Sequence, residues 1–306
     1  MIKKIDNILI IKHGSLGDII QADGIIRAIK ATHSESHIAL LTTSNYYRLM
    51  KRSPYIDEVL IDDRRPLWNL RAIYLLYNKV RSYKFSAVYD LQNSQRTSLY
   101  KRYLISNAKW ITTERKHHPV SGLRGLSEML QSAGIEKKYL LKPNIFWLAN
   151  NVTNLLKKKK IKQNYILLLP GSSINHKEKR WPYYSELARL LLNDKYNVVS
   201  VLGPEELSLV NEIPGHILTN LNWENLAGII KKASFIVGND SGPSHIASCL
   251  NKKGIALFGP KTSAVRSELK RGNFNTIKVE NLFELDAKKI QSIILKRTIF
   301  RVKKLA

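Results

Sequence analysis

The chain has 306 residues, enough for two domains of ordinary size, and its 44% hydrophobic content is that of a globular protein rather than a disordered one. Fifty Lys and Arg against 24 Asp and Glu give a net charge of +26, so we expect an anionic partner: nucleic acid, a membrane surface or a phosphorylated substrate. One cysteine excludes an internal disulfide, and no apolar stretch is long enough for a signal peptide or a membrane span, which predicts a cytoplasmic protein.

The first half of the chain alternates strand-like and helix-like segments. Apolar runs predict strands at 8–11, 37–41, 58–61 and 87–91. Apolar residues at helical spacing from Ile19 to Ile29 predict an amphipathic helix after the first strand, and the Leu-, Ile- and Tyr-rich segment 67–80 predicts another. This alternation is typical of an α/β fold with a parallel sheet.

The second half repeats the alternation after a change of composition near Asn150 and a lysine run at 157–160. Strands are predicted at 165–169, 197–202, 235–237, 255–258 and 277–279, and helices at 182–192, 224–232, 243–250 and 284–297. We therefore predict two doubly wound, Rossmann-like domains, 1–155 and 156–306, which face each other across a cleft. A further expectation is that residues 290–306 pack back on the N-terminal domain.

The loop after the first strand carries the first candidate catalytic residue. The segment from Gly14 to Asp18 matches neither a Walker A loop nor a complete G-x-G-x-x-G motif. One interpretation makes Asp18 or Ser15 a helix cap worth about 1 kcal/mol. The other makes the Asp18 carboxylate a general base at the carboxyl end of the strand, where it accepts a hydroxyl proton.

Two loops of the second half have the composition of phosphate-binding segments. Ser172 and Ser173 follow the strand 165–169, and Lys179 lies shortly before the next helix. We expect Lys177 in the same loop to be solvated.

The segment 238–245 (GNDSGPSH) joins a buried strand to a helix whose first turn suits Pro243. Backbone N–H groups and the positive helix end favour a phosphate there. The alternative roles are a helix cap for Asp240 and an ordinary polar residue for His245.

These motifs together resemble the lipopolysaccharide heptosyltransferase family of GT-B glycosyltransferases, glycosyltransferase family 9. The resemblance is carried by ILIIKHGSLGD at 8–18, PGSS at 170–173, KRWP at 179–182, GNDSGPSH at 238–245 and ALFGP at 256–260. They occur in the family's order and at comparable spacing. Ser241 stands where many relatives have Thr, and Lys261 follows Gly259-Pro260 where a Thr is usual.

The resemblance implies an inverting transfer of heptose from ADP-heptose, with Asp18 as the base and Lys179 neutralising the leaving diphosphate. It also implies contacts to the nucleotide sugar from Ser172, Ser173, Asp240, Ser241, Gly242 and His245. Neither a metal site nor a cofactor is expected, since Asp62-Asp63 is not an Asp-x-Asp motif and GT-B enzymes generally work without a divalent ion. Another nucleotide sugar as donor is the first alternative.

The acceptor that the resemblance implies is the acidic inner core of lipid A, at the inner face of the inner membrane. Arg64, Arg65 and Arg115 are predicted to bind it, because guanidinium groups pair with carboxylates in bidentate geometry. The lysine run 157–160 is predicted to be a solvated linker or a patch on an anionic membrane surface. The charge of +26 leaves a nucleic-acid-binding protein as a rival, but no nucleic-acid module is recognised, so we expect none as partner.

Overall fold

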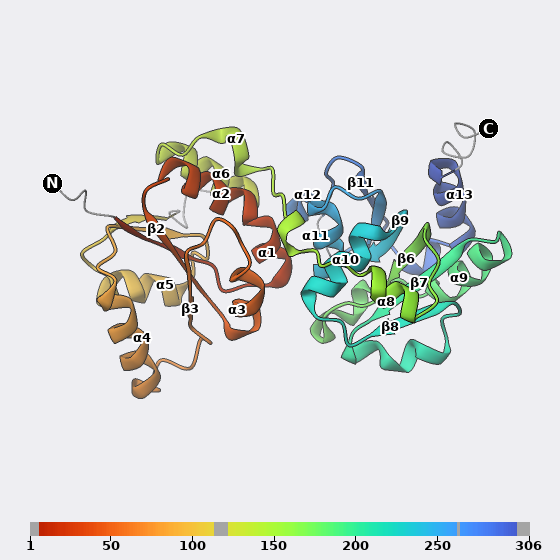
Figure 1. Cartoon of the computed structure of the whole chain (residues 1–306), viewed down its shortest axis with the longest axis horizontal. Helices are drawn as coiled ribbons and strands as arrows, with labels where there is room; N and C mark the ends of the chain where they lie inside the picture. Colours follow the sequence, from red (N-terminus) through yellow and green to blue (C-terminus); the bar gives the residue numbers. More distant parts are fainter. Residues whose placement is uncertain (1–5, 113–121, 262–263, 299–306) are drawn as a thin grey trace. The chain divides into compact units, whose positions relative to one another are not determined.

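The computed structural model describes residues 6–112, 122–261 and 264–298. The chain forms two compact units, Met1–Trp147 and Leu148–Ala306 (Figure 1). The predicted break after residue 155 falls inside helix α8 (Thr153–Lys158), which belongs to the second unit. The segment before α8 is tied to the same unit, because the Asn150 N–H donates to the Glu224 carbonyl at 3.0 Å.

The N-terminal unit is built on a five-stranded parallel sheet with the order β3-β2-β1-β4-β5. Its strands are β1 (Asn7–Ile11), β2 (His37–Thr42), β3 (Glu58–Ile61), β4 (Ala87–Asp90) and β5 (Lys109–Ile111). Its helical segments are α1 (Leu16–Gln21), α2 (Asp23–Thr32), α3 (Ser44–Met50), α4 (Leu70–Ser82), α5 (Gln95–Leu99), the π-helical turn η1 (Tyr100–Leu104), α6 (Leu123–Ser132), α7 (Lys137–Leu140) and η2 (Phe146–Leu148). The strand order reverses beside β1, where open parallel sheets bind ligands at their carboxyl edge.

The C-terminal unit is built on a six-stranded parallel sheet with the order β11-β10-β9-β6-β7-β8. Its strands are β6 (Tyr165–Leu169), β7 (Asn197–Leu202), β8 (His216–Thr219), β9 (Phe235–Asn239), β10 (Gly254–Phe258) and β11 (Phe274–Lys278). The helical segments after α8 are η3 (Ile174–Lys179), α9 (Tyr184–Asn193), η4 (Pro204–Asn211), α10 (Trp223–Lys232), α11 (Gly242–Cys249), α12 (Ala264–Ser267), η5 (Leu282–Glu284) and α13 (Ala287–Thr298). Here the order reverses between β6 and β9, so the loops after these two strands lie at the reversal.

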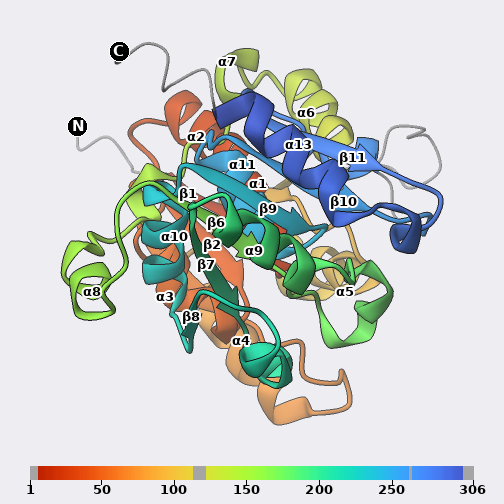
Figure 2. The ribbon, with the colours of Figure 1, turned by 90° about the vertical axis from the view of Figure 1, so that its right-hand side faces the viewer.

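The final helix α13 packs against α9 on the C-terminal sheet (Figure 2). Ile290 and Ile294 on α13 are fully buried in the same core as Leu187 and Leu191 on α9. The described part of the segment expected to return to the N-terminal domain therefore packs on its own unit. Residues 299–306 lie outside the described part of the chain.

Asp23 is a buried carboxyl group that holds the start of α2 to η2 and the residues just before it. Its Oδ2 accepts from the Asn144 N–H at 2.7 Å and its Oδ1 from the Trp147 indole N–H at 2.9 Å. Burial raises the pKa of Asp23 to about 6, although both hydrogen bonds oppose the shift. The folded protein therefore holds a proton at this site at a pH where the unfolded chain has lost it.

This difference predicts that Asp23 lowers stability as the pH rises. Its contribution to the free energy of unfolding should fall by up to about 3 kcal/mol between pH 4 and pH 6 and stay constant above that window. Urea unfolding of the wild type and of Asp23→Asn, which does not titrate, measures this contribution as the difference between the two proteins. A difference that stays constant from pH 4 to pH 7 contradicts the prediction.

Candidate active site

A lysine and a carboxylate meet at the carboxyl edge of the C-terminal sheet. Lys179 ends η3, which follows β6, and Asp240 follows β9 directly. The Lys179 ammonium donates to Asp240 Oδ2 at 2.8 Å, and the two side chains are only 21% and 12% exposed. Lys179 and Asp240 belong to separate sequence motifs. The fold brings them together between β6 and β9, where the strand order reverses.

Asn239, the last residue of β9, is fully buried and holds these loops in place. Its side-chain carbonyl accepts from the Trp181 backbone N–H at 3.1 Å and from the Tyr184 hydroxyl at 3.0 Å. Its amide group donates to the carbonyls of Pro170 at 2.7 Å and Gly171 at 3.3 Å. One side chain therefore fixes both ends of the loop that carries Lys179.

A second set of hydrogen bonds also holds the loop after β6 in its conformation. The Arg180 guanidinium donates to Glu206 Oε1 at 2.5 Å and to Ser172 Oγ at 3.1 Å. The Ser172 hydroxyl in turn donates to the His176 carbonyl at 2.9 Å. The hydroxyl of Ser172 thus makes contacts within the loop, and its predicted contact with phosphate stays a prediction. Ser173 is exposed and directly precedes η3.

The start of α11 has the features of an anion site. Ser241 is the residue before the first turn, and its Oγ is buried without a hydrogen-bond partner among the described residues. Gly242 opens the helix, so its N–H has no acceptor within the helix. His245 lies half-buried in the first turn. A hydroxyl, a free N–H and the positive end of the helix all favour a negatively charged ligand.

Lys261 adds a second cation beside Lys179. The two lysines line a small pocket of about 70 Å³ together with Glu178, Gly259 and Pro260. The residue that departs from the usual Thr thus places its charge next to the lysine predicted to contact the diphosphate.

In the N-terminal unit, Asp18 lies exposed in the first turn of α1. Its Oδ2 accepts from the Ser15 backbone N–H at 2.9 Å and from the Ser15 hydroxyl at 3.2 Å. This reciprocal arrangement is a capping box, so Ser15 is the cap and Asp18 its partner. Burial lowers the pKa of the nearby Lys12, while the charges of Asp18 and Asp90 oppose the shift.

A buried cluster centred on Asp62 joins the loops after β1 and β3 to the helical segments α5 and η1. His13 Nε2 lies 3.0 Å from Asp62 Oδ2, the Arg96 guanidinium donates to both Asp62 oxygens at 2.8 and 2.9 Å, and Tyr100 donates its hydroxyl proton. Burial alone would raise the pKa of Asp62, but these hydrogen bonds outweigh it and hold that pKa well below its usual range. Arg96 also donates to the Arg65 carbonyl at 2.6 Å. Sequence reasoning missed this cluster, because its members lie in segments far apart in the chain.

The three predicted acceptor-binding arginines have different positions. Arg64 and Arg65 are exposed in the loop after β3. The Arg64 N–H donates to Asp62 Oδ1 at 2.9 Å, so the buried cluster fixes this loop. Arg115 lies outside the described residues.

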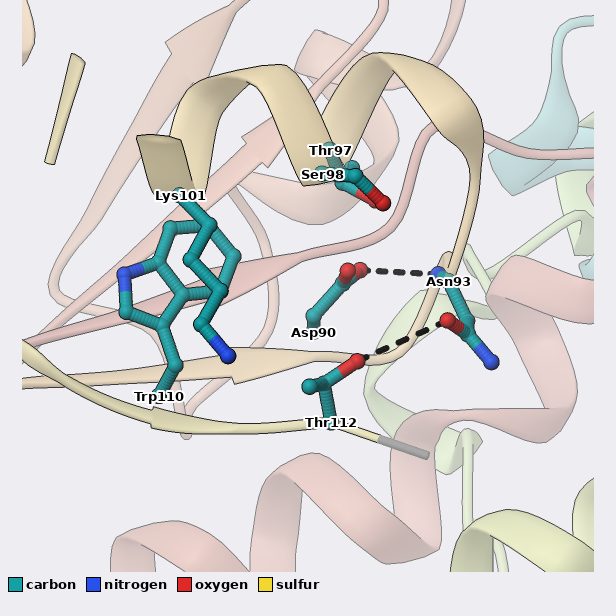
Figure 3. A pocket seen from close by; sticks show the side chains of 7 residues that line it. All are labelled: Asp90, Asn93, Thr97, Ser98, Lys101, Trp110 and Thr112. Carbon is teal, nitrogen blue, oxygen red and sulfur yellow. Dashed lines mark hydrogen bonds between the residues drawn. The ribbon is translucent and has the colours of Figure 1, made fainter. Parts of the chain in front are cut away.

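A polar pocket of about 230 Å³ opens at the carboxyl ends of β4 and β5 (Figure 3). Asp90 accepts from the Asn93 N–H at 2.8 Å, and Lys101 and Trp110 lie together on the other side. The remaining lining residues are Thr97, Ser98 and Thr112. Hydroxyl, amide and charged groups beside an indole suit a ligand rich in hydroxyl groups. In the part of the chain that the structure describes, no group of three His, Cys, Asp or Glu side chains is placed to hold a metal ion.

The role of Asn239 leads to a stability prediction. Asn239→Ala leaves the buried Trp181 N–H and Pro170 carbonyl without their hydrogen-bond partner. It should lower the free energy of unfolding by about 4 kcal/mol. Tyr184→Phe removes only one of these hydrogen bonds and should cost about 1 kcal/mol. Urea unfolding followed by tryptophan fluorescence measures both. Equal small losses in the two variants would show that Asn239 does not hold the loops together.

Comparisons with known proteins agree with this geometry. The sequence model of the family glycosyltransferase family 9 (heptosyltransferase) matches residues 132–271. This range contains the loops after β6 and β9. Lipopolysaccharide heptosyltransferase 1 of Campylobacter coli is 25% identical over 91% of this chain and 92% of its own length. Lipopolysaccharide heptosyltransferase 2 of Escherichia coli K12 is 24% identical, over 83% of each chain.

Solved structures of similar proteins show the same fold. The E. coli ADP-heptose lps heptosyltransferase II matches with a TM-score of 0.74 at 17% identity, over 95% of this chain and 99% of that one. E. coli heptosyltransferase WaaC with ADP-2-deoxy-2-fluoro heptose matches with a TM-score of 0.73 at 17% identity, over 95% and 100%. The predicted GT-B fold is confirmed. The resemblance of the sequence to the heptosyltransferases of glycosyltransferase family 9 is confirmed as a similarity, and this similarity supports a glycosyltransferase activity.

Proposed function

We propose that this enzyme transfers heptose from ADP-heptose to the inner core of lipopolysaccharide, with inversion at the anomeric carbon and without a metal ion. The names of its relatives, lipopolysaccharide heptosyltransferases 1 and 2, support the sugar and the acceptor class. The observation that carries the proposal is the Lys179–Asp240 pair beside the start of α11. It combines a cation with an anion-binding helix end at the edge of the sheet where nucleotides bind.

The C-terminal unit is proposed to hold the nucleotide sugar. Lys179 and Lys261 take the diphosphate charge, with the Ser241 hydroxyl and the Gly242 N–H as further donors to its oxygens. Asp240 orients the Lys179 ammonium and accepts from hydroxyl groups of the donor. As the bond to the anomeric carbon breaks, Lys179 stabilises the negative charge that develops on the diphosphate.

The N-terminal unit is proposed to supply the base and the acceptor site. The Asp18 carboxylate takes the proton of the acceptor hydroxyl while that oxygen forms the bond to the anomeric carbon and ADP departs. The capping box holds this carboxylate in one orientation. Arg64 and Arg65, exposed beside the buried Asp62 cluster, pair with carboxylates and phosphates of the inner core. Such a lipid-linked acceptor places the enzyme at the inner face of the inner membrane.

Calorimetric titration with ADP, ADP-heptose and UDP-sugars in the presence of EDTA tests the donor. We expect metal-free binding of the ADP compounds, with the affinity lowered about 10- to 100-fold by Lys179→Ala because a charge-assisted bond to phosphate is lost. Lys177→Ala is the matched control, since Lys177 is an exposed lysine of the same loop, and it should change affinity less than about threefold. A preference for UDP-sugars changes the donor, and binding only to nucleic acid contradicts the proposal.

Asp18→Asn tests the base. The amide keeps one oxygen that accepts from the Ser15 N–H, so the helix start and the binding of ADP should both survive. The rate of transfer to a lipid A precursor carrying its inner-core sugars should fall at least about 100-fold, because the amide cannot take the acceptor proton. Transfer at the wild-type rate would leave Asp18 with the capping role alone.

A further inference from the structure

Large apolar side chains are exposed side by side on α4 and the loop before it. Leu67, Trp68, Leu70, Tyr74 and Leu75 are 45%, 80%, 76%, 63% and 59% exposed. We call these five residues the α4 surface. In both views α4 forms the lower edge of the N-terminal unit (Figures 1 and 2). Contiguous exposed apolar side chains of this size mark an interaction site rather than ordinary surface.

The α4 surface is not the core-facing side of the helix. Leu76 and Val80 are buried in the same apolar core as Leu9 and Tyr100, and they attach α4 to the sheet. Tyr74 and Leu75 precede Leu76 and lie on the outer side, as their exposure shows. The helix thus has apolar residues on two sides, and only one side is needed to hold the unit together.

The loop that presents the first part of this surface is held in a defined conformation. The Asn69 side chain caps α4 by accepting from the Ala72 N–H at 3.1 Å. Arg96, itself fixed by the buried Asp62, donates to the Arg65 carbonyl at 2.6 Å. Leu67 and Trp68 are therefore presented to the outside by an anchored loop.

The segment that carries the α4 surface is rich in positive charge. The sequence from 64 to 84 contains six Lys and Arg and no Asp or Glu: Arg64, Arg65, Arg71, Lys79, Arg81 and Lys84. Tyr and Leu on the outer side of the helix, Trp in the loop before it and cations in the same segment give the composition of a structure that lies in the interface of an anionic bilayer. A second copy of the chain would bring the same cations against each other, so self-association is disfavoured.

We propose that the α4 surface docks the enzyme on an anionic lipid bilayer, with Trp68, Leu70, Tyr74 and Leu75 entering the boundary between headgroups and acyl chains. This goes beyond the proposed transfer reaction, since none of the five apolar residues has a proposed role in it, although Leu67 and Trp68 lie on the same loop as Arg64 and Arg65. Arg71, Lys79, Arg81 and Lys84 bind the lipid headgroups, and added salt weakens this attraction by screening it.

The lysine run 157–160 provides the contrast. Its four side chains are exposed, whereas the apolar neighbours Leu156 and Ile161 are buried in the C-terminal unit. This segment offers charge and nothing to insert, so it does not form the main contact with the bilayer.

Vesicle sedimentation tests the proposal with the full chain. The wild type should bind vesicles of equal phosphatidylcholine and phosphatidylglycerol, and bind pure phosphatidylcholine at least about tenfold more weakly. The triple variant Trp68→Ser, Leu70→Ser, Leu75→Ser should lower partitioning into the mixed vesicles at least about 100-fold. A matched triple variant, Leu207→Ser, Val265→Ser, Phe283→Ser, removes exposed apolar side chains of the C-terminal unit and should bind like the wild type.

Two results with the first variants overturn the proposal: the wild type does not bind the mixed vesicles, or the first triple variant binds them as tightly as the wild type. The proposal also fails if the matched triple variant loses as much binding as the first. It fails as well if binding is lost only in the quadruple variant Lys157→Ser, Lys158→Ser, Lys159→Ser, Lys160→Ser. Light scattering that shows a dimer split by the first triple variant would instead assign the surface to a second copy. Transfer to a short, soluble acceptor should be unchanged in the first triple variant. If the wild type binds vesicles but transfers no sugar, the proposed function fails and the docking surface stands.

Discussion

The arrangement of the C-terminal site depends on the buried side chain of Asn239. Its four hydrogen bonds join the end of β9 to the loop after β6, before and after the position of Lys179. Asp240 follows Asn239 directly, so the residue that fixes the loop also sets the place of the carboxylate that receives the Lys179 ammonium. A neutral amide has a smaller desolvation cost than a charged group, because it carries no net charge. Its oxygen and nitrogen both have hydrogen-bond partners, so no buried polar atom of this side chain is left unsatisfied.

In the N-terminal unit, a buried charged residue holds the loops in position. Asp62 is almost fully buried, yet it stays ionised because Arg96, Tyr100 and His13 surround it. Replacing such a cluster by apolar residues is often neutral or stabilising in other proteins, so stability alone does not account for it. Its effect here is positional: it ties the loop that carries Arg64 and Arg65 to η1, and η1 is a π-helical turn of the kind often found at functional sites.

The fold was predictable wherever burial alone decides the sequence pattern. The predicted strands 58–61, 165–169 and 197–202 coincide with β3, β6 and β7. Two strands were missed, because β5 has three residues and begins with exposed Lys109, and β8 is only half-buried. Roles within the site were harder to predict. The motif containing Ser172 was recognised, but the hydrogen bond that its hydroxyl accepts comes from Arg180, which Glu206 holds in place. Glu206 is far from this motif in the sequence and reaches it only in the folded chain.

The large positive charge is spread along the chain, and the placement of the acids divides the cations into two groups. Acidic residues are outnumbered roughly two to one, yet Asp62, Asp240 and Glu206 each pair with a cation in a segment that follows a strand. These pairs hold cationic side chains in fixed positions, as recognition of a small, highly charged substrate requires. Between 64 and 84 there is no acid at all. A segment with cations and no acid of its own is suited to a diffuse anion such as a membrane surface, where total charge matters more than the position of each group.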